Sequence, residues 1–195
     1  MVPIQIGILL FVAKKTTKTY KITKLMPYTE HSKMTEYLLF IVVIGAWSLI
    51  VGNLLYPLEE GLRDSLFSFV PYPLRNVDTS LIPKSKLLFT ACFDVLVNGI
   101  IAPVTEELYF RGFLLPRIKL SPNMAVVASA VLFSIYHFFS PWCFFSRVLM
   151  TLPIYYWVMK RKNIRFSIIS HIIANVTYSG SILLQLLFNT PRLFG

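Results

Sequence analysis

The chain has 195 residues, of which 55% are hydrophobic and only 14% are charged, and its mean hydropathy is +0.64. So few charged residues cannot solvate the surface of a water-soluble domain of this length. The net charge of +10 could indicate a nucleic-acid partner, but the basic residues are distributed between apolar segments. We therefore expect an all-α, polytopic transmembrane helical bundle in contact with membrane lipid and without a nucleic-acid partner.

The N-terminal segment 1–36 is predicted to precede the first membrane span. Residues 1–13 are apolar, but they lack the basic residue that a secretory signal carries ahead of its hydrophobic run. A helix over residues 1–13 would extend about 20 Å, which is less than the ~30 Å thickness of the hydrocarbon core. We therefore expect an interfacial apolar helix, followed by a Lys-rich cytosolic segment.

Apolar segments close to the length of a membrane span follow one another along the rest of the chain. They cover about residues 37–57, 87–116, 122–140, 141–159 and 166–189. We expect residues 37–86 to form the first span and an outer loop, and residues 87–189 to form a transmembrane core. Pro103 and Pro116 predict a kink and an end in the second segment, because proline breaks helical hydrogen bonding.

The distribution of basic residues predicts the orientation in the membrane. Thirteen of the nineteen Lys and Arg residues lie in three basic segments, residues 14–33, 111–119 and 160–165. Basic residues are enriched on the cytoplasmic side of membrane proteins, so we expect these segments to face the cytosol. The remaining basic residues are expected on the outside: Arg63, Arg75, Lys84, Lys86, Arg147 and Arg192.

Three short patterns place polar, chemically reactive side chains inside apolar segments. Ionisable side chains are costly within a membrane, so each pattern indicates a functional site. Two of the three histidines of the chain belong to them. The patterns are Glu106-Glu107-Leu-Tyr-Phe-Arg111, Phe133-Ser-Ile-Tyr-His137 and His171-Ile-Ile-Ala-Asn175.

The first pattern predicts different roles for its two carboxylates. On a helix, Glu107 and Arg111 are four residues apart and can form an ion pair, whereas Glu106 is rotated by about 100° from Glu107. Glu106 would then face a polar cavity, where it could deprotonate a water molecule and later return the proton to a leaving amine. The simpler interpretation is that both carboxylates only hold helices together, although one pair would suffice for that.

The second and third patterns each place a histidine on the same helix face as a partner. Phe133 would wall the cavity below His137, and His137 could hold the water, bind a metal or stabilise an oxyanion. His171 and Asn175 would suit an oxyanion site, because the amide can donate to a carbonyl oxygen that gains negative charge. Taken singly, these histidines could equally be helix–helix hydrogen-bonding residues.

These three patterns resemble the motifs of the CPBP family, the CAAX proteases and bacteriocin-processing enzymes also called the Abi family. Glu-Glu-x-x-x-Arg, Phe-x-x-x-His and His-x-x-x-Asn/Asp all match without a substitution, and the resemblance covers about residues 87–180. It implies an intramembrane endopeptidase that uses a glutamate-activated water on a membrane-associated or lipidated peptide or a prenylated protein, as in type II CAAX endopeptidases. It implies supporting roles for Glu107 and Arg111 and catalytic roles for Glu106, His137, His171 and Asn175.

The location and the cofactor follow as further expectations. We expect a multi-pass protein of the cell membrane, with an active site that is reached from the cytosolic side. Glu106, His137 and His171 combine imidazole and carboxylate ligands that could bind zinc, and the same residues could work without a metal.

Two other functions are compatible with a membrane bundle. A non-catalytic scaffold or bacteriocin self-immunity protein could use the same fold to bind a partner, but it would not need Glu and His within the bilayer. A small transporter could use Asp94, Glu106 and Glu107 as a proton path, but the sequence has no internal repeat and few spans.

Overall fold

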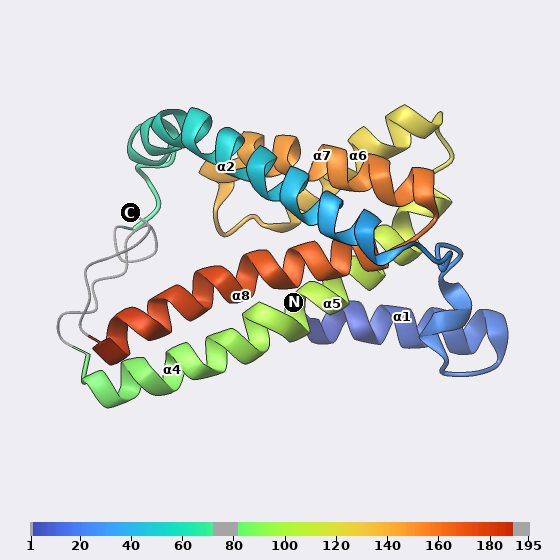
Figure 1. Ribbon diagram of the computed structural model, residues 1–195, viewed down its shortest axis with the longest axis horizontal. Helices are drawn as coiled ribbons and strands as arrows, with labels where there is room; N and C mark the ends of the chain where they lie inside the picture. Colours follow the sequence, from blue (N-terminus) through green and yellow to red (C-terminus); the bar gives the residue numbers. More distant parts are fainter. Residues whose placement is uncertain (1, 72–81, 189–195) are drawn as a thin grey trace.

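The computed structural model describes residues 2–71 and 82–188, and within these ranges the chain is helical with short connections (Figure 1). The helices are α1 (Val2–Thr17), α2 (Met34–Asp64), α4 (Lys84–Leu96), α5 (Ala102–Glu107), α6 (Pro122–Tyr136), α7 (Phe144–Arg161) and α8 (Arg165–Phe188). Short 3-10 turns are η1 (Ile22–Leu25), η4 (Leu115–Arg117) and η5 (Pro141–Cys143), and π-helical segments are η2 (Val97–Ile101) and η3 (Leu108–Leu114). The prediction of an all-α helical membrane bundle is confirmed.

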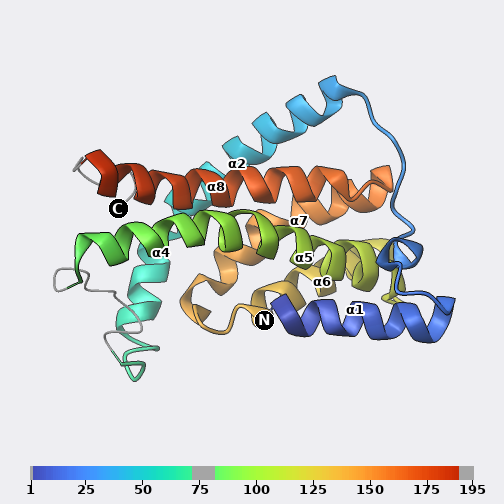
Figure 2. The same ribbon diagram turned by 90° about the horizontal axis from the view of Figure 1, so that it is seen from below.

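The helices form two layers (Figure 1). One layer contains α8 beside α4 and α5, with α1 packed against α5, and the other contains α2, α6 and α7. The views of Figures 1 and 2 agree that α8 lies along α4. The N-terminal helix therefore contacts the helix that carries the two glutamates; its buried residues Gln5, Leu9 and Ala13 recur every four positions and form one face.

Within the described residues, three helices are long and apolar enough to cross a membrane. They cover Met34–Asp64, Lys84–Arg117 and Arg165–Phe188. The expectation for residues 122–140 is wrong in its bounds, because α6 ends at Tyr136 and its 15 residues extend only about 22 Å. The first predicted span is longer than expected, since α2 continues through residues 58–64 of the predicted outer loop. Part of that loop, residues 72–81, lies outside the described residues.

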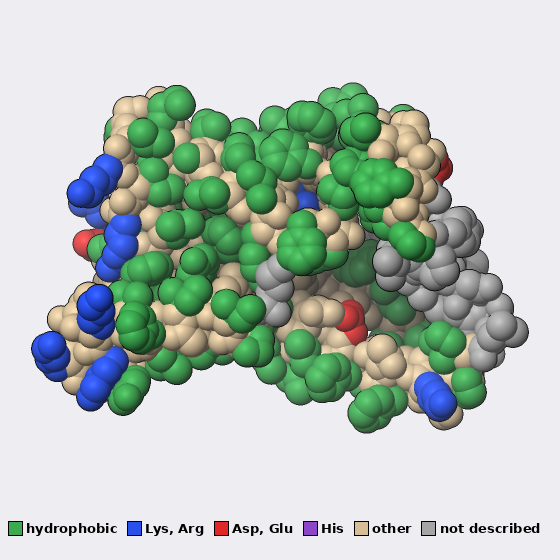
Figure 3. Space-filling model, turned by 180° about the vertical axis from the view of Figure 1, so that it is seen from behind, with side chains coloured by type: hydrophobic (Ala, Val, Ile, Leu, Met, Phe, Trp, Pro, Cys, Tyr) green, Lys and Arg blue, Asp and Glu red, His purple; other side chains and the backbone are tan. Residues whose placement is uncertain are grey.

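The outer surface has the apolar character that lipid requires. On α2, for example, Val42 is 68% and Leu54 is 73% exposed although both are hydrophobic. Figure 3 shows a face dominated by apolar side chains, with most of its basic side chains gathered at one end. Within a bilayer these exposed apolar groups contact lipid tails, so they carry no penalty from water.

The three basic segments meet at one end of the bundle. The Arg117 guanidinium donates to the carbonyl oxygen of Leu25 over 3.1 Å, and the Ile164 amide donates to the carbonyl oxygen of Tyr28 over 3.1 Å. Lys162, in the left-handed conformation with φ 49°, ends α7 and reverses the chain into α8. The structure thus places these segments on a common side, as predicted, and their cytosolic orientation stays a prediction.

The helix that carries Glu106 and Glu107 changes its hydrogen-bonding register twice. The π-helical segments η2 and η3 lie directly before and after α5, so the amide of Ala102 donates to the carbonyl oxygen of Val97, five residues earlier. A π-helical turn shifts the side chains that follow around the helix axis, and such turns are frequent at functional sites. The apolar helix Lys84–Arg117 therefore contains a local distortion at the carboxylates themselves.

Close packing between α8 and η2 holds this distorted region. A Cβ atom at Gly99 would lie 3.1 Å from Cγ2 and 3.6 Å from Cα of Val176. Gly99→Leu should therefore separate the two helices and destabilise the bundle by about 1–3 kcal/mol, the usual cost of overpacking. Thermal unfolding of the purified protein in detergent measures this as a lower Tm.

Gly61→Leu is the matched control, because a Cβ atom at Gly61 would have no neighbour within 4 Å. Its Tm should equal or exceed that of the wild type, since leucine favours helix more than glycine does. Equal melting of both variants would contradict the close contact between α8 and η2.

Candidate active site

A cavity of about 720 Å³ is lined by residues of both helical layers. This volume is typical of a ligand-binding site. Its walls include Ile44 and Ser48 from α2 and Arg147 and Thr151 from α7. Side chains of all three sequence motifs also line it: Glu106, Glu107, Arg111, Phe133, His137, His171 and Asn175. The motifs are far apart in the chain, and the fold brings them to one cavity.

Glu107 is the central charged group of the site, and its side chain is only 1% exposed. Its Oε2 lies 2.9 Å from Nε of Arg111, so the ion pair predicted from the four-residue spacing is present. Its Oε1 accepts a hydrogen bond of 2.8 Å from Nδ1 of His171 on α8. A buried carboxylate needs such partners, because an isolated ion out of water is very costly.

Two aromatic rings enclose the Arg111 guanidinium. Its Cζ lies 4.2 Å from the centre of the Phe133 ring and 3.8 Å from that of Tyr155. Cation–π attraction of this kind grows stronger when the charge is removed from water. The sequence predicted that Phe133 lines the cavity. In the structure Phe133 also helps to hold the cation that neutralises Glu107.

Glu106 faces His137 across the cavity. Its Oε2 is 3.9 Å from Nε2 of His137, too long for a direct hydrogen bond. A water molecule between the two could bond to both. The Tyr136 side chain also interacts with the Glu106 carboxylate. The two neighbouring carboxylates thus differ as predicted: Glu107 is paired with a cation, and Glu106 lines the cavity without a neighbouring arginine within ion-pair distance among the described residues.

Hydrogen bonds determine which nitrogen of each histidine carries a proton. Nδ1 of His137 lies 2.8 Å from the carbonyl oxygen of Phe133, and a carbonyl oxygen can only accept, so this nitrogen is protonated. Nδ1 of His171 donates to Glu107 for the same reason. In both rings Nε2 is therefore the nitrogen left for chemistry, and in His137 it is the one nearest to Glu106.

Asn175 lines the cavity and also supports the distorted helix. Its Nδ2 donates to the carbonyl oxygen of Asn98 over 2.9 Å. In the π-helical register the next amide would come from residue 103, but Pro103 has no N–H to donate. The asparagine amide supplies the missing donor. Since an amide nitrogen carries two hydrogens, one remains for a substrate oxygen.

The predicted zinc ligands do not form a three-ligand site. Within residues 2–71 and 82–188, no three His, Cys, Asp or Glu side chains lie close enough together to hold a metal ion. The donor chemistry of Glu106, His137 and His171 suits zinc, but the geometry does not gather them around one point. Zinc stays a prediction, which chelation followed by zinc re-addition would test.

Three residues of the site were not predicted from the three motifs. Tyr136 and Tyr155 are ordinary aromatic residues in sequence, and no local signal marks them. Arg147 was assigned to the outer side by the count of basic residues, whereas the structure places it in the cavity wall. An arginine within the apolar segment 141–159 was the available signal, because charges in such segments are usually functional.

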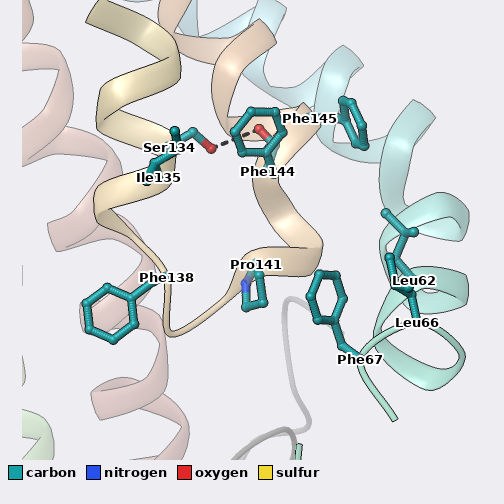
Figure 4. A pocket seen from close by; sticks show the side chains of 9 residues that line it. All are labelled: Leu62, Leu66, Phe67, Ser134, Ile135, Phe138, Pro141, Phe144 and Phe145. Atoms are coloured by element: carbon teal, nitrogen blue, oxygen red, sulfur yellow. Dashed lines mark hydrogen bonds between the residues drawn. The ribbon is translucent and has the colours of Figure 1, made fainter. Parts of the chain in front are cut away.

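A second pocket, of about 390 Å³, lies against the segment that joins α6 to α7 (Figure 4). Its nine lining residues include Leu66 and Phe67 beyond the end of α2 and Phe144 at the start of α7. The Ser134 hydroxyl donates to the carbonyl oxygen of Phe144 over 2.9 Å and joins the two helices there. No ionisable side chain lines this pocket, whereas the carboxylates and imidazoles of the three motifs line the larger cavity.

The partners of Glu107 make a prediction about stability. Arg111→Met should lower the free energy of unfolding by about 3–5 kcal/mol, because it leaves a buried carboxylate without its cation. Glu107→Gln combined with Arg111→Met should recover part of this loss, since the neutral amide still offers an oxygen to His171. Thermal or denaturant unfolding of the single and double variants measures both effects. A double variant no more stable than Arg111→Met would show that the two residues are not energetically coupled.

Comparison with known proteins identifies a family that one stretch of the chain resembles. Residues 88–177 match the family described as type II CAAX prenyl endopeptidase Rce1-like, and this stretch contains all three motifs. No curated protein and no solved structure matches the chain. The resemblance inferred from the motifs is confirmed. Residues 88–177 are therefore similar to the type II CAAX prenyl endopeptidase Rce1-like proteins.

Proposed function

We propose that this protein hydrolyses a peptide bond of a membrane-associated, lipid-modified substrate with a water molecule activated by Glu106. The observation that carries the proposal is the 3.9 Å separation between Oε2 of Glu106 and Nε2 of His137 inside the cavity. Both atoms can accept a hydrogen bond, so a water between them has its two hydrogens directed to Glu106 and His137. A lone pair of that water then points at the substrate carbonyl.

The chemical steps follow from this arrangement. The water oxygen bonds to the carbonyl carbon while Glu106 accepts one of its protons. Glu106 then passes the proton to the amide nitrogen, the carbon–nitrogen bond breaks, and an amine and a carboxylic acid that retains the second proton of the water are released; the acid then gives up this proton to the amine or to solvent. The carboxylate of Glu106 is regenerated, so one residue acts first as base and then as acid.

In the proposed mechanism, stabilisation of the oxyanion is assigned to His171 and Asn175. In its doubly protonated form, His171 donates from Nδ1 to Glu107 and from Nε2 to the substrate oxygen. Asn175 holds the carbonyl of Asn98 with one hydrogen and can offer the other. Donors held in place before the reaction stabilise developing charge effectively, because they need no reorganisation.

An apolar groove beside the cavity supports a lipid-bearing substrate. The groove, of about 350 Å³, lies between α2 and α8 and is lined by Ile41, Gly45 and Leu49 on the α2 side. It shares several lining residues with the catalytic cavity: Ile44, Ser48, Ser170, Ala174 and Tyr178. A prenyl chain in this groove would keep the attached peptide next to the cavity. We propose that the substrate is a prenylated protein or peptide, as the family description suggests.

Replacement of the proposed base makes the first test. Glu106→Gln should lower kcat by at least about 10²-fold on a farnesylated peptide with a CAAX-type C-terminus, because it removes the group that takes the proton. Its Tm should stay within a few degrees of the wild type, since size and hydrogen-bonding capacity are retained. Mass spectrometry of the products measures cleavage and its position.

The control for this test is Glu60→Gln, at an exposed carboxylate on α2 that bonds to Tyr56 and Arg63. It should cleave like the wild type. Full activity of Glu106→Gln would remove Glu106 from the mechanism, and absence of cleavage by the wild type under all conditions would count against the proposed function as a whole.

Filling the groove tests the proposed lipid site. A Cβ atom at Gly45 would meet nothing within 4 Å, so Gly45→Phe can fold while its ring occupies the groove. The KM for a farnesylated peptide should rise about tenfold, because the prenyl chain loses the apolar surface that it covers. Gly61→Phe, which lies outside the groove, is the matched control and should leave KM unchanged. An unchanged KM for Gly45→Phe would place the lipid elsewhere.

A further inference from the structure

Arg147 is a cationic residue in the wall of the catalytic cavity that the proposed chemistry does not use. It lies on α7, whereas Glu106 lies on α5 in the other layer. Its guanidinium donates to neutral oxygens of one short stretch: Nη2 bonds to the Ser140 hydroxyl over 2.7 Å and to the Ser140 carbonyl over 3.5 Å, and Nη1 bonds to the Ser134 carbonyl over 3.4 Å.

Arg147 has no carboxylate partner within the described part of the chain. Among the described residues, no carboxylate oxygen lies within 4.0 Å of the Arg147 guanidinium. Glu59 and Glu106 act on it only electrostatically, at longer range. By contrast, Arg111, the other arginine in the cavity lining, has Glu107 at 2.9 Å and two aromatic rings. A partly buried cation without a counter-ion is costly, so its presence indicates an anion that binds from outside.

We propose that Arg147 binds the free C-terminal carboxylate of the peptide substrate and so selects chains that end inside the cavity. This inference rests on the proposed function and names the part of the substrate that the cavity recognises. A guanidinium has five N–H donors, and the three bonds to Ser134 and Ser140 leave two for the incoming carboxylate.

The positions of Arg147 and of the Glu106–His137 pair determine the direction in which the peptide substrate lies in the cavity. The bond to be cut lies between Glu106 on α5 and His137 at the end of α6, and the chain end lies at Arg147 on α7, in the layer that faces Glu106. The residues that follow the cut bond therefore occupy the cavity between them and leave as a short peptide with its own carboxylate. A continuing chain would place an uncharged amide at Arg147 and would have to pass through the cavity wall.

The serines keep Arg147 in position without neutralising it. Ser134 also joins α6 to α7 through its hydroxyl, and Ser140 lies in the segment between these helices. Neutral oxygens orient the guanidinium but leave its full charge for a ligand. Inside the helical bundle, the carboxylate of the substrate could therefore form an ion pair with Arg147 that is little weakened by water.

The experiment compares two peptides with two forms of the enzyme. The peptides are a farnesylated CAAX-type sequence with a free C-terminal carboxylate and the same sequence with a C-terminal carboxamide. The wild type should cleave the carboxylate form with a kcat/KM about 10- to 100-fold higher, as expected for a charge-assisted hydrogen-bonded pair. In Arg147→Gln the ratio of the two kcat/KM values should fall to about one.

Three further variants separate recognition from folding. Arg147→Lys keeps the charge and should keep part of the preference. Ser140→Ala removes the 2.7 Å partner but leaves the cation, so the preference should persist even if the Tm falls. Arg161→Gln, which removes an arginine paired with Glu36 away from the cavity, should not change the ratio.

The outcomes are distinct. Equal cleavage of the two peptides by the wild type, or an unchanged preference in Arg147→Gln, would overturn the role of Arg147 while the proteolytic function stands. A loss of activity in Arg147→Gln that is equal for both peptides would mean that the residue only supports the fold or the catalytic groups. Cleavage of neither peptide by the wild type would instead count against the proposed function.

Discussion

The buried charge of Glu107 is the constraint on which the site depends. A carboxylate with 1% exposure must be compensated, and Arg111 and His171 do so from the same helix and from α8. These contacts also distinguish the groups of the site: the pairing with Arg111 sets Glu107 apart from Glu106, and in the proposed mechanism the bond to His171 decides which imidazole nitrogen is left for the substrate. The ion pair is enclosed by Phe133 and Tyr155, which connect it to α6 and α7.

A distorted helix places the carboxylates within reach of these partners. A regular helix satisfies its own backbone, but the π-helical register and Pro103 leave the carbonyl of Asn98 in need of a donor. Asn175 provides it, and Gly99 allows α8 to approach closely enough for the bond to form. The third motif thus has a structural role as well as its proposed catalytic one. A loss of enzymatic activity after substitution of Asn175 must therefore be interpreted together with the stability of the variant.

The cavity combines three kinds of surface that together describe a substrate. In the proposed function the Glu106–His137 pair acts on a peptide bond, the groove between α2 and α8 offers apolar surface, and Arg147 offers a positive charge without a carboxylate partner among the described residues. A lipid-modified peptide with a free carboxylate has all three complementary features. The groove and Arg147 depend on α2 and α7, and α2 lies outside the segment 88–177 that matches the family. The N-terminal part of the chain therefore contributes to the proposed substrate site.

Apolar composition and spacing were sufficient to predict an all-α membrane bundle, the three motifs and the Glu107–Arg111 pair, because these depend on local periodicity and on the cost of charge in lipid. The end of α6 at Tyr136, the π-helical turns and the Glu107–His171 bond could not be obtained in this way. Each depends on contacts between helices that are distant in the chain. Periodicity shows which face of a helix is polar, and only the packed bundle decides which groups from other helices meet that face.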